Sequence, residues 1–240
     1  MHNRFPSPEA KKVYVNSMFD QISGCYDRFC GWSSFGMDAR WRRRLAASLD
    51  GCRNILDLCT GTGAVARALS HRRNSTPRRI VGVDFSLPMV VLAAAKEEGS
   101  SSNENTIRYA LADAESLPFL NHTFDGISCA FSFRNIARLD EALREIYRVL
   151  RPGGKLAVLD LTRPRNPLFQ RFYFSWMGTI TPAIGKLLSG TPDPFQYLRQ
   201  SILDFQTPQA LIERMRGAGF SSVTHQTSWG GVLGFFLATR

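Results

Sequence analysis

Long hydrophobic runs and metal-ligand patterns are scarce in this 240-residue sequence, and each shortage excludes a class of protein. The longest apolar run lies around Met89–Ala95 and is far too short for a membrane-spanning helix, which needs about 20 residues. The opening residues, Met-His-Asn-Arg-Phe-Pro, lack the apolar core of a signal peptide. We therefore expect a cytoplasmic protein that is at most peripherally associated with a membrane.

Cysteine and histidine are also too few and too scattered to form a metal site. No Cys-x-x-Cys pair occurs, and no histidine stands near a cysteine at metal-ligand spacing. We expect reduced thiols and no bound metal. The five cysteines are Cys25, Cys30, Cys52, Cys59 and Cys129.

Acidic residues are outnumbered by basic ones, 20 against 30, which leaves a formal net charge of +10 at pH 7. This excess suits an anionic partner, either nucleic acid or an acidic membrane surface, without choosing between them. The composition is otherwise ordinary, with 44% hydrophobic and 21% charged residues. Length and composition together predict a single α/β domain over residues 1–240.

The stretch Asn54–Ala64 reads as a strand, a glycine-rich loop and the start of a helix. Ile55 and Leu56 belong to an apolar run typical of a strand covered on both faces. Gly61 and Gly63 permit positive φ or a close approach of the backbone to a ligand. Because such loops open at the carboxyl ends of parallel strands, we expect a small molecule to bind here.

Acidic residues stand where three successive predicted strands end. Asp57 follows the first apolar run, Asp84 closes a strand over 79–85, and Asp113 follows one over 106–111. The Asp84 carboxylate could accept hydrogen bonds from both hydroxyls of a ribose. The alternative is that it caps the next helix, although Ser86 and Pro88 already suit that start.

The residues after the second and third strands suit an adenine ring. Asp113 offers an acceptor for the amino group, and Ala114 and Phe85 offer apolar walls. The stretch Gly61–Ala66 lacks the third glycine of a dinucleotide-binding motif, so an adenosine without a pyrophosphate fits better.

Strands and helices alternate through the rest of the chain, which predicts a parallel sheet. A fourth strand over 124–133 runs into Arg134 and Asn135, a polar pair at the strand tip beside the cleft. A helix over 139–150 and a fifth strand over 155–161 follow. A last helix over 209–217 precedes strands at 222–227 and 231–238, which can pair antiparallel at the sheet edge.

Two segments lie outside this alternation, and each has two interpretations. Residues 9–50 are helical and aromatic, and they either pack on the sheet or cover the ligand loop, with Tyr26 and Asp27 at a turn. Residues 164–206 form either a packed helix pair, which could be the contact of a homodimer, or a wall for a long apolar substrate. The arginines beside Trp41 favour a solvated face over a nucleic-acid site; they are Arg40, Arg42, Arg43 and Arg44.

These motifs resemble, in order, those of class I S-adenosylmethionine-dependent methyltransferases, and within them the ubiquinone/menaquinone biosynthesis C-methyltransferases. The resemblance covers nearly the whole chain. It rests on Asp57-Leu-Cys-Thr-Gly-Thr-Gly63, Gly82-Val-Asp84, Ala112-Asp-Ala-Glu-Ser-Leu-Pro-Phe119, Arg134-Asn135 and Tyr147-Arg-Val-Leu-Arg-Pro-Gly-Gly-Lys155, with flanking segments Phe19-Asp-Gln-Ile22, Tyr26-Asp27, Phe195-Gln-Tyr-Leu198, Ala218-Gly-Phe220 and Gly230-Gly231.

The resemblance implies a Rossmann-like fold with a seven-stranded, mostly parallel sheet, an antiparallel C-terminal edge and helices on both faces. It implies an N-terminal helical lid (1–50), a cofactor-binding core (51–163), a lid or substrate insertion (164–206) and a C-terminal helix with edge strands (207–240). It implies S-adenosylmethionine as cofactor, bound by Asp57, Gly61, Thr62, Gly63, Asp84, Phe85, Asp113, Ala114 and Ala130.

The implied reaction is C-methylation of the ring of a prenylated quinol, most simply demethylmenaquinol, or the benzoquinol step of ubiquinone synthesis. Arg134 would stabilise a ring phenolate, because a guanidinium is a poor base, and Asn135 would orient it. Asp27, Tyr26 or water would take the proton. The prenyl tail implies an anionic membrane surface as partner.

The sequence departs from the family pattern at two positions. Ala130 stands where the family has serine, which leaves one hydrogen bond to the cofactor open, and Ser132 replaces a glycine. A small-molecule C- or O-methyltransferase of another pathway shares all the cofactor motifs. An RNA methyltransferase is less favoured, and no nucleic-acid partner is expected, because the fourth strand ends in Phe133-Arg-Asn rather than Asn-Pro-Pro-aromatic.

Overall fold

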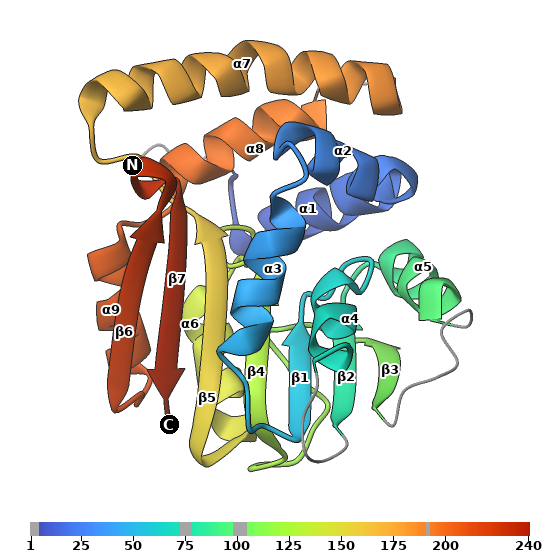
Figure 1. The fold of residues 1–240 in the computed structure, drawn as a ribbon, viewed down its shortest axis with the longest axis vertical. Coiled ribbons are helices and arrows are strands. Elements are labelled where there is room, and N and C mark those ends of the chain that lie inside the picture. Colours follow the sequence, from blue (N-terminus) through green and yellow to red (C-terminus); the bar gives the residue numbers. More distant parts are fainter. Residues whose placement is uncertain (1–4, 73–77, 98–104, 191–192) are drawn as a thin grey trace.

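The computed structural model describes residues 5–72, 78–97, 105–190 and 193–240, and its strands form a single sheet (Figure 1). The strand order is β3-β2-β1-β4-β5-β7-β6. Neighbours from β3 to β5 pair in parallel, whereas β7 pairs antiparallel with both β5 and β6. The predicted seven-stranded sheet with an antiparallel C-terminal edge is therefore confirmed. The strands are β1 (Asn54–Leu58), β2 (Arg79–Asp84), β3 (Thr106–Leu111), β4 (Phe124–Ala130), β5 (Leu150–Leu161), β6 (Ser222–Ser228) and β7 (Leu233–Thr239).

Successive side chains of each buried strand point to opposite faces of the sheet. Both faces are therefore apolar, and helices cover both. Leu156 and Val158 of β5 pack in a core with helices α6 (Leu139–Val149) and α9 (Pro208–Gly217). The intervening Ala157 and Leu159 pack in a second core with α3 (Asp38–Ala47) and α4 (Ala64–Ser70). Helix α5 (Leu87–Glu97) follows β2 and packs against both β2 and β3.

Strand bounds differ from the expected ones where the backbone cannot stay extended. β4 ends at Ala130 rather than Phe133, because Phe131 adopts a φ of 62°. β2 ends at Asp84, since the Ser86 hydroxyl accepts the amide of Met89 and starts α5. β5 begins at Leu150 instead of Lys155, and its pairing with β4 is irregular between these two points.

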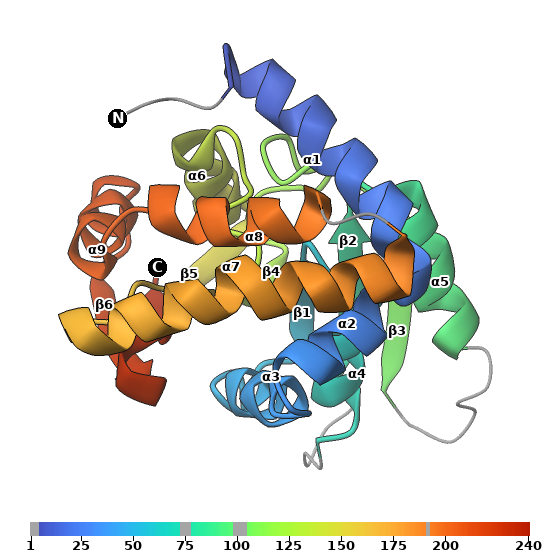
Figure 2. The ribbon, with the colours of Figure 1, turned by 90° about the horizontal axis from the view of Figure 1, so that it is seen from above.

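The remaining helices lie beyond the carboxyl ends of the parallel strands (Figures 1 and 2). They are α1 (Pro8–Ile22), the short 3-10 turn Ser23–Cys25, α2 (Tyr26–Ser33), α7 (Pro167–Ser189) and α8 (Asp193–Asp204). A second short 3-10 turn, Trp229–Gly231, joins β6 to β7. The rings of Phe29 and Phe195 lie 4.2 Å apart, and those of Tyr14 and Tyr197 lie 5.4 Å apart. Two segments far apart in the sequence, one before β1 and one between β5 and α9, thus form one helical layer.

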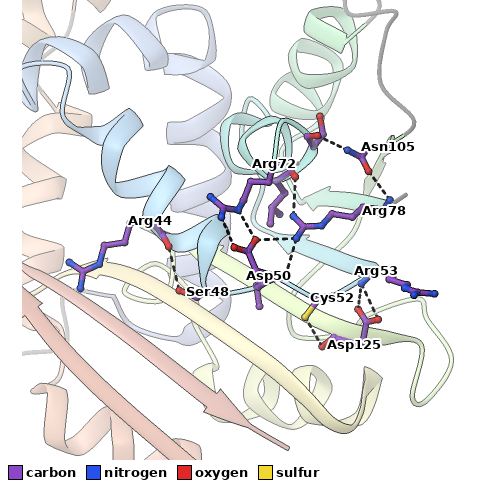
Figure 3. A network of polar contacts seen from close by, with 12 residues as sticks. Arg44, Ser48, Asp50, Cys52, Arg53, Arg72, Arg78, Asn105 and Asp125 are labelled. Atoms are coloured by element: carbon purple, nitrogen blue, oxygen red, sulfur yellow. Dashed lines mark hydrogen bonds and ion pairs between the residues drawn. The ribbon is translucent and has the colours of Figure 1, made fainter. Parts of the chain in front are cut away.

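The opposite end of the sheet is tied together by polar contacts (Figure 3). The buried Arg78 guanidinium donates to the carbonyl oxygens of Leu69 and Leu49 at 3.1 and 3.3 Å, and to Asp50 at 3.3 Å. Asp125 accepts from the amides of Arg53 and Asn54. These bonds fix the chain where strands enter the sheet, at the end remote from the helical layer.

Within the described residues, the helices are too short or too polar for any of them to span a bilayer. The first four residues, on which the expectation about a signal peptide partly rests, lie outside this part of the chain.

At Gly185 of α7, an added Cβ would overlap the ring of Phe195 on α8. We predict that Gly185→Ala lowers the free energy of unfolding by about 1–3 kcal/mol, because overpacking outweighs the better helix propensity of alanine. Gly178→Ala is the control, since its Cβ would lie 3.6 Å from Arg199 Nε in ordinary contact. It should be neutral or stabilising by up to about 1 kcal/mol. Urea unfolding of both variants measures this, and equal effects would contradict the close contact.

Candidate functional site

The loop between β1 and α4 has the backbone that the sequence predicts. Gly61 and Gly63 adopt φ values of 55° and 80°, and Cys59 holds a φ of 53° despite its side chain. A Cβ at Gly63 would collide with the hydroxyl of Tyr109. The loop therefore depends on glycine for both its turn and its packing.

Asp57 lies beneath this loop and is 1% exposed. Its Oδ2 accepts from Thr60 Oγ1 at 2.5 Å and from the Ala66 amide at 3.1 Å, and its Oδ1 accepts from Ser128 Oγ at 2.7 Å. Burial raises its pKa to about 6, and the hydroxyl donors only partly oppose the rise. Both oxygens are thus engaged in holding the loop against α4 and β4.

Asp84 lines the cavity that opens above the loop and is 7% exposed. Its Oδ2 accepts from the Gly61 amide at 2.8 Å and its Oδ1 from the Ser86 amide at 3.0 Å. Burial raises the pKa of Asp84, against the opposing effect of these amides. Each carboxylate oxygen retains capacity for a further hydrogen bond. Because Ser86 itself accepts the Met89 amide, Asp84 is not needed to cap α5.

The expected adenine end contains a residue that sequence reasoning missed. Asp113, Ala114 and Phe85 line the same cavity as Asp84. Asp113 also forms an ion pair with Lys12 of α1, whose side chain reaches Glu115 as well. No local pattern could reveal this contact, because Lys12 and Asp113 are 101 residues apart.

This first cavity encloses about 900 Å³ of space, including its part open to solvent. It contains Asp57, Gly61, Asp84, Phe85, Asp113, Ala114 and Ala130 among its walls, seven of the nine residues expected to bind the cofactor. Thr62 and Gly63 are not part of its lining. Thr62 instead donates its hydroxyl to Asp27 at 2.7 Å. The acidic strand end, the apolar walls and the buried, unpartnered Oδ1 of Asn135 fit an adenosyl amino acid.

A second cavity adjoins the first beneath α7. Arg134 lines it together with Tyr26, Phe131 and the α7 residues Tyr173 and Trp176. Most of this lining is aromatic or aliphatic. It therefore suits an apolar ring more than a polar ligand.

Arg134 is held in place by an acidic partner on the sheet. Its Nη1 lies 2.5 Å from Asp160 Oδ1 and 2.5 Å from the Phe131 carbonyl oxygen, and its Nε donates to Ser201 Oγ at 3.3 Å. Asp160 is fully buried. The carboxylate that braces Arg134 thus belongs to β5.

Within the described residues, no hydrogen bond joins the side chains of Asn135 and Arg134. Its Nδ2 lies 3.5 Å from the Phe131 carbonyl oxygen, which Arg134 also contacts. The expectation that Asn135 orients Arg134 therefore stays a prediction. Their shared partner is the strained turn at Phe131, and Asn135 lines the first cavity instead of the second.

The two candidate proton acceptors lie in different surroundings. Asp27 forms an ion pair with Lys96 and belongs to the lining of neither cavity. Burial would raise its pKa, but Lys96 and Thr62 outweigh that effect and lower it. Tyr26 lines both cavities, and burial raises its pKa, so its hydroxyl stays protonated at neutral pH. The geometry suits Tyr26 as a donor.

Arg42 is a second buried arginine, and for this residue the expectation of a solvated face is wrong. It is 7% exposed and lines both cavities. Helical spacing could have found it, since Arg42 stands three, four and seven residues before the buried Leu45, Ala46 and Leu49. The adjacent arginines masked that periodicity.

Asp57 should make stability depend on pH in a defined direction. Its pKa of about 6 in the folded protein exceeds the ordinary 3.8, so the folded state binds the proton more tightly. Relative to Asp57→Asn, the wild type should lose on the order of 3 kcal/mol of unfolding free energy as pH rises from about 4 to about 7. Urea unfolding of both proteins across this range measures the difference. Parallel pH profiles would contradict a raised pKa at Asp57.

Known proteins resemble this chain both in sequence and in fold. The model of the ubiE/COQ5 methyltransferase family matches residues 7–240. A demethylmenaquinone methyltransferase from Thermus thermophilus is 40% identical, over 85% of this chain and 91% of that protein. A ubiquinone/menaquinone biosynthesis C-methyltransferase from Allorhizobium ampelinum is 35% identical, over 92% and 87%.

Solved structures support the fold at low sequence identity. The cyclase SpnF superimposes with a TM-score of 0.66 at 20% identity, over 98% of this chain and 97% of its own. A possible histamine N-methyltransferase from Thermotoga maritima gives 0.65 at 17% identity, over 94% and 99%. These likenesses establish the fold but no particular activity. The family match over nearly the whole length is what assigns the chain: it belongs to the ubiE/COQ5 methyltransferase family.

Proposed function

We propose that this protein transfers the methyl group of S-adenosylmethionine to a ring carbon of a prenylated quinol. One observation carries the proposal: an apolar cavity containing a buried, ion-paired guanidinium directly adjoins a cavity with the features of an adenosyl site. The relatives named demethylmenaquinone methyltransferase favour demethylmenaquinol as substrate. Those named for both pathways keep the benzoquinol of ubiquinone synthesis as the alternative.

The cofactor would be held along the ends of β1, β2 and β3. Asp84 would accept the ribose hydroxyls, while Phe85, Ala114 and Asp113 would surround the adenine. When bound, S-adenosylmethionine supplies an electrophilic methyl group, and the enzyme must hold a carbon nucleophile close to it in the absence of water. The aromatic walls of the second cavity would shield that point from water.

Arg134 would act on the negative charge that develops on the ring oxygen. A quinol carbon becomes nucleophilic when a ring hydroxyl loses its proton, and the resulting phenolate needs a fixed cation. Asp160 holds the guanidinium in position and leaves its charge permanent. Water at the ring hydroxyl, away from the methyl group, is the favoured proton acceptor, because Asp27 lies outside both cavities and Tyr26 is protonated.

We predict that Arg134→Lys lowers the turnover number about 10²–10³-fold, because lysine keeps the charge but loses the planar fork. Cofactor affinity should change little, since Arg134 does not line the first cavity. Steady-state kinetics with a short-chain demethylated naphthoquinol measures turnover, and calorimetry measures cofactor affinity. Arg163→Lys is the control, because Arg163 also contacts backbone carbonyl oxygens near α8 but lines neither of these two cavities. Normal turnover in Arg134→Lys would remove this residue from the mechanism.

A small-molecule methyltransferase of another pathway remains the second candidate. It would use the same first cavity but a more polar acceptor. The naphthoquinol assay separates the two functions, because such an enzyme would bind S-adenosylmethionine without methylating the quinol. An RNA acceptor has less support, since one arginine of the basic run is buried between the cavities.

The outward face of α7 suggests where a prenylated substrate arrives. Its inward side chains line the second cavity, while Leu168, Phe172 and Leu187 are 79%, 66% and 75% exposed. The helix carries Arg171 and Lys186 but no acidic residue. It lies across the helical layer on the side away from the sheet (Figures 1 and 2). We infer that this face docks on an anionic membrane, where the prenyl tail would reside.

We predict that the protein sediments with phosphatidylglycerol vesicles at low salt, binds phosphatidylcholine vesicles weakly, and is released by salt. Phe172→Glu should weaken vesicle binding about tenfold or more, because it replaces an apolar contact with a repelled charge. Leu120→Glu is the control, since Leu120 is 83% exposed in the loop before β4.

Two outcomes would contradict membrane docking through α7. Equal binding by both glutamate variants would show that α7 is not the docking face. A Phe172→Glu protein that changes from dimer to monomer without lipid would assign this face to a homodimer instead.

A further inference from the structure

Arg42 of α3 is a buried cation at the junction of the two cavities. Tyr26 and Arg42 are the residues common to both linings within the described chain. The guanidinium carbon of Arg42 lies 5.5 Å from the centre of the Phe131 ring. Phe131 follows β4 and Asp113 follows β3, so the strand order β3-β2-β1-β4 places Arg42 and Asp113 beyond different strands, with β1 and β2 between them.

The hydrogen-bonding capacity of Arg42 is not used up by its neighbours. Its Nε is buried and has no hydrogen-bond partner, and the nearest carboxylate oxygen, Asp38 Oδ2, lies 3.5 Å away. Asp38 in turn accepts a hydrogen bond from Ser34 at 3.0 Å. A buried guanidinium is costly unless an anion satisfies it. Arg134 differs, since Asp160 contacts it at 2.5 Å.

The orientation of the proposed cofactor places an anion at this junction. If Asp84 binds the ribose and Asp113 lies at the adenine, the amino-acid end must extend away from β2 and β3, toward β1 and β4. For transfer to a quinol in the second cavity, the methyl group would have to face that cavity, which would place the amino-acid end near Tyr26 and Arg42, the residues that line both cavities. The carboxylate is the one anionic group of S-adenosylmethionine, and Arg42 is the buried cation common to both cavities.

We propose that Arg42 binds the methionyl carboxylate of S-adenosylmethionine and thereby fixes the position of the methyl group. This inference rests on the proposed function for the identity of the cofactor. The planar guanidinium can meet a carboxylate with two parallel hydrogen bonds, which sets direction as well as affinity. Asp57, on the same wall, is a carboxylate whose charge interacts favourably with Arg42. A carboxylate bound to Arg42 would also neutralise part of its positive charge. The repulsion between Arg42 and the positively charged sulfonium would then be smaller.

Calorimetry with two ligands isolates the carboxylate contact. S-adenosylhomocysteine contains the amino acid, whereas 5′-methylthioadenosine keeps adenosine and sulfur but lacks both the carboxylate and the amino group. Arg42→Met should weaken S-adenosylhomocysteine binding about thirtyfold, the loss of a charge-assisted contact, while changing methylthioadenosine binding less than about twofold. Arg42→Lys should show a smaller loss confined to the same ligand.

Arg43→Met is the matched control, since Arg43 is the exposed neighbour on the same helix. It should bind both ligands as the wild type does. Equal losses for both ligands in Arg42→Met, or failure of both Arg42 variants to fold, would overturn the proposal in favour of a structural role. Unchanged S-adenosylhomocysteine affinity with a raised KM for the quinol would overturn it in favour of substrate binding.

The proposed function and this inference can fail separately. A wild-type protein that binds neither adenosyl ligand would refute the cofactor and with it both proposals. A wild-type protein that binds S-adenosylhomocysteine but does not methylate the naphthoquinol would refute the quinol alone. In that case the selective loss in Arg42→Met would still support the carboxylate contact.

Discussion

The assembly of the site depends on the hydrogen bonds that the buried Asp57 carboxylate accepts. This carboxylate joins the loop through Thr60, helix α4 through the amide of Ala66, and β4 through Ser128. These groups belong to three different elements, so one side chain sets their relative positions at the carboxyl end of β1. The same burial that raises the pKa of Asp57 makes its donors strong, because few water molecules compete for the carboxylate.

The two buried arginines differ in how their charges are compensated. Arg134 has a fully buried ion-pair partner, Asp160, and is locked by the Phe131 carbonyl oxygen. Arg42 has a more distant carboxylate and an aromatic ring beside it. A cation that the protein already neutralises can act by fixed geometry, whereas an incompletely neutralised one favours an incoming anion. This contrast agrees with the two proposed roles, Arg134 in the chemistry of the substrate and Arg42 in the orientation of the cofactor.

Local sequence patterns could predict the sheet and the acidic strand ends, because buried strands and glycine loops are set by nearby residues. Asp84 and Asp113 follow apolar runs, and both reach the first cavity. The Lys12–Asp113 and Arg134–Asp160 pairs could not be predicted, since each joins residues far apart in the chain. The turn at Phe131 also eluded prediction, because its positive φ contradicts the preference of a phenylalanine.

The helical layer has a core of its own, built from Ile22, Cys25, Phe29 and Phe195, separate from the two cores of the sheet. Segments with separate cores open as separate cooperative units, at a lower free energy than global unfolding. Amide hydrogen exchange should therefore be slow in the sheet and faster in the helical layer. Because residues of α1, α2 and α7 line the two cavities, a single opening of this layer gives both ligands access while the sheet stays folded.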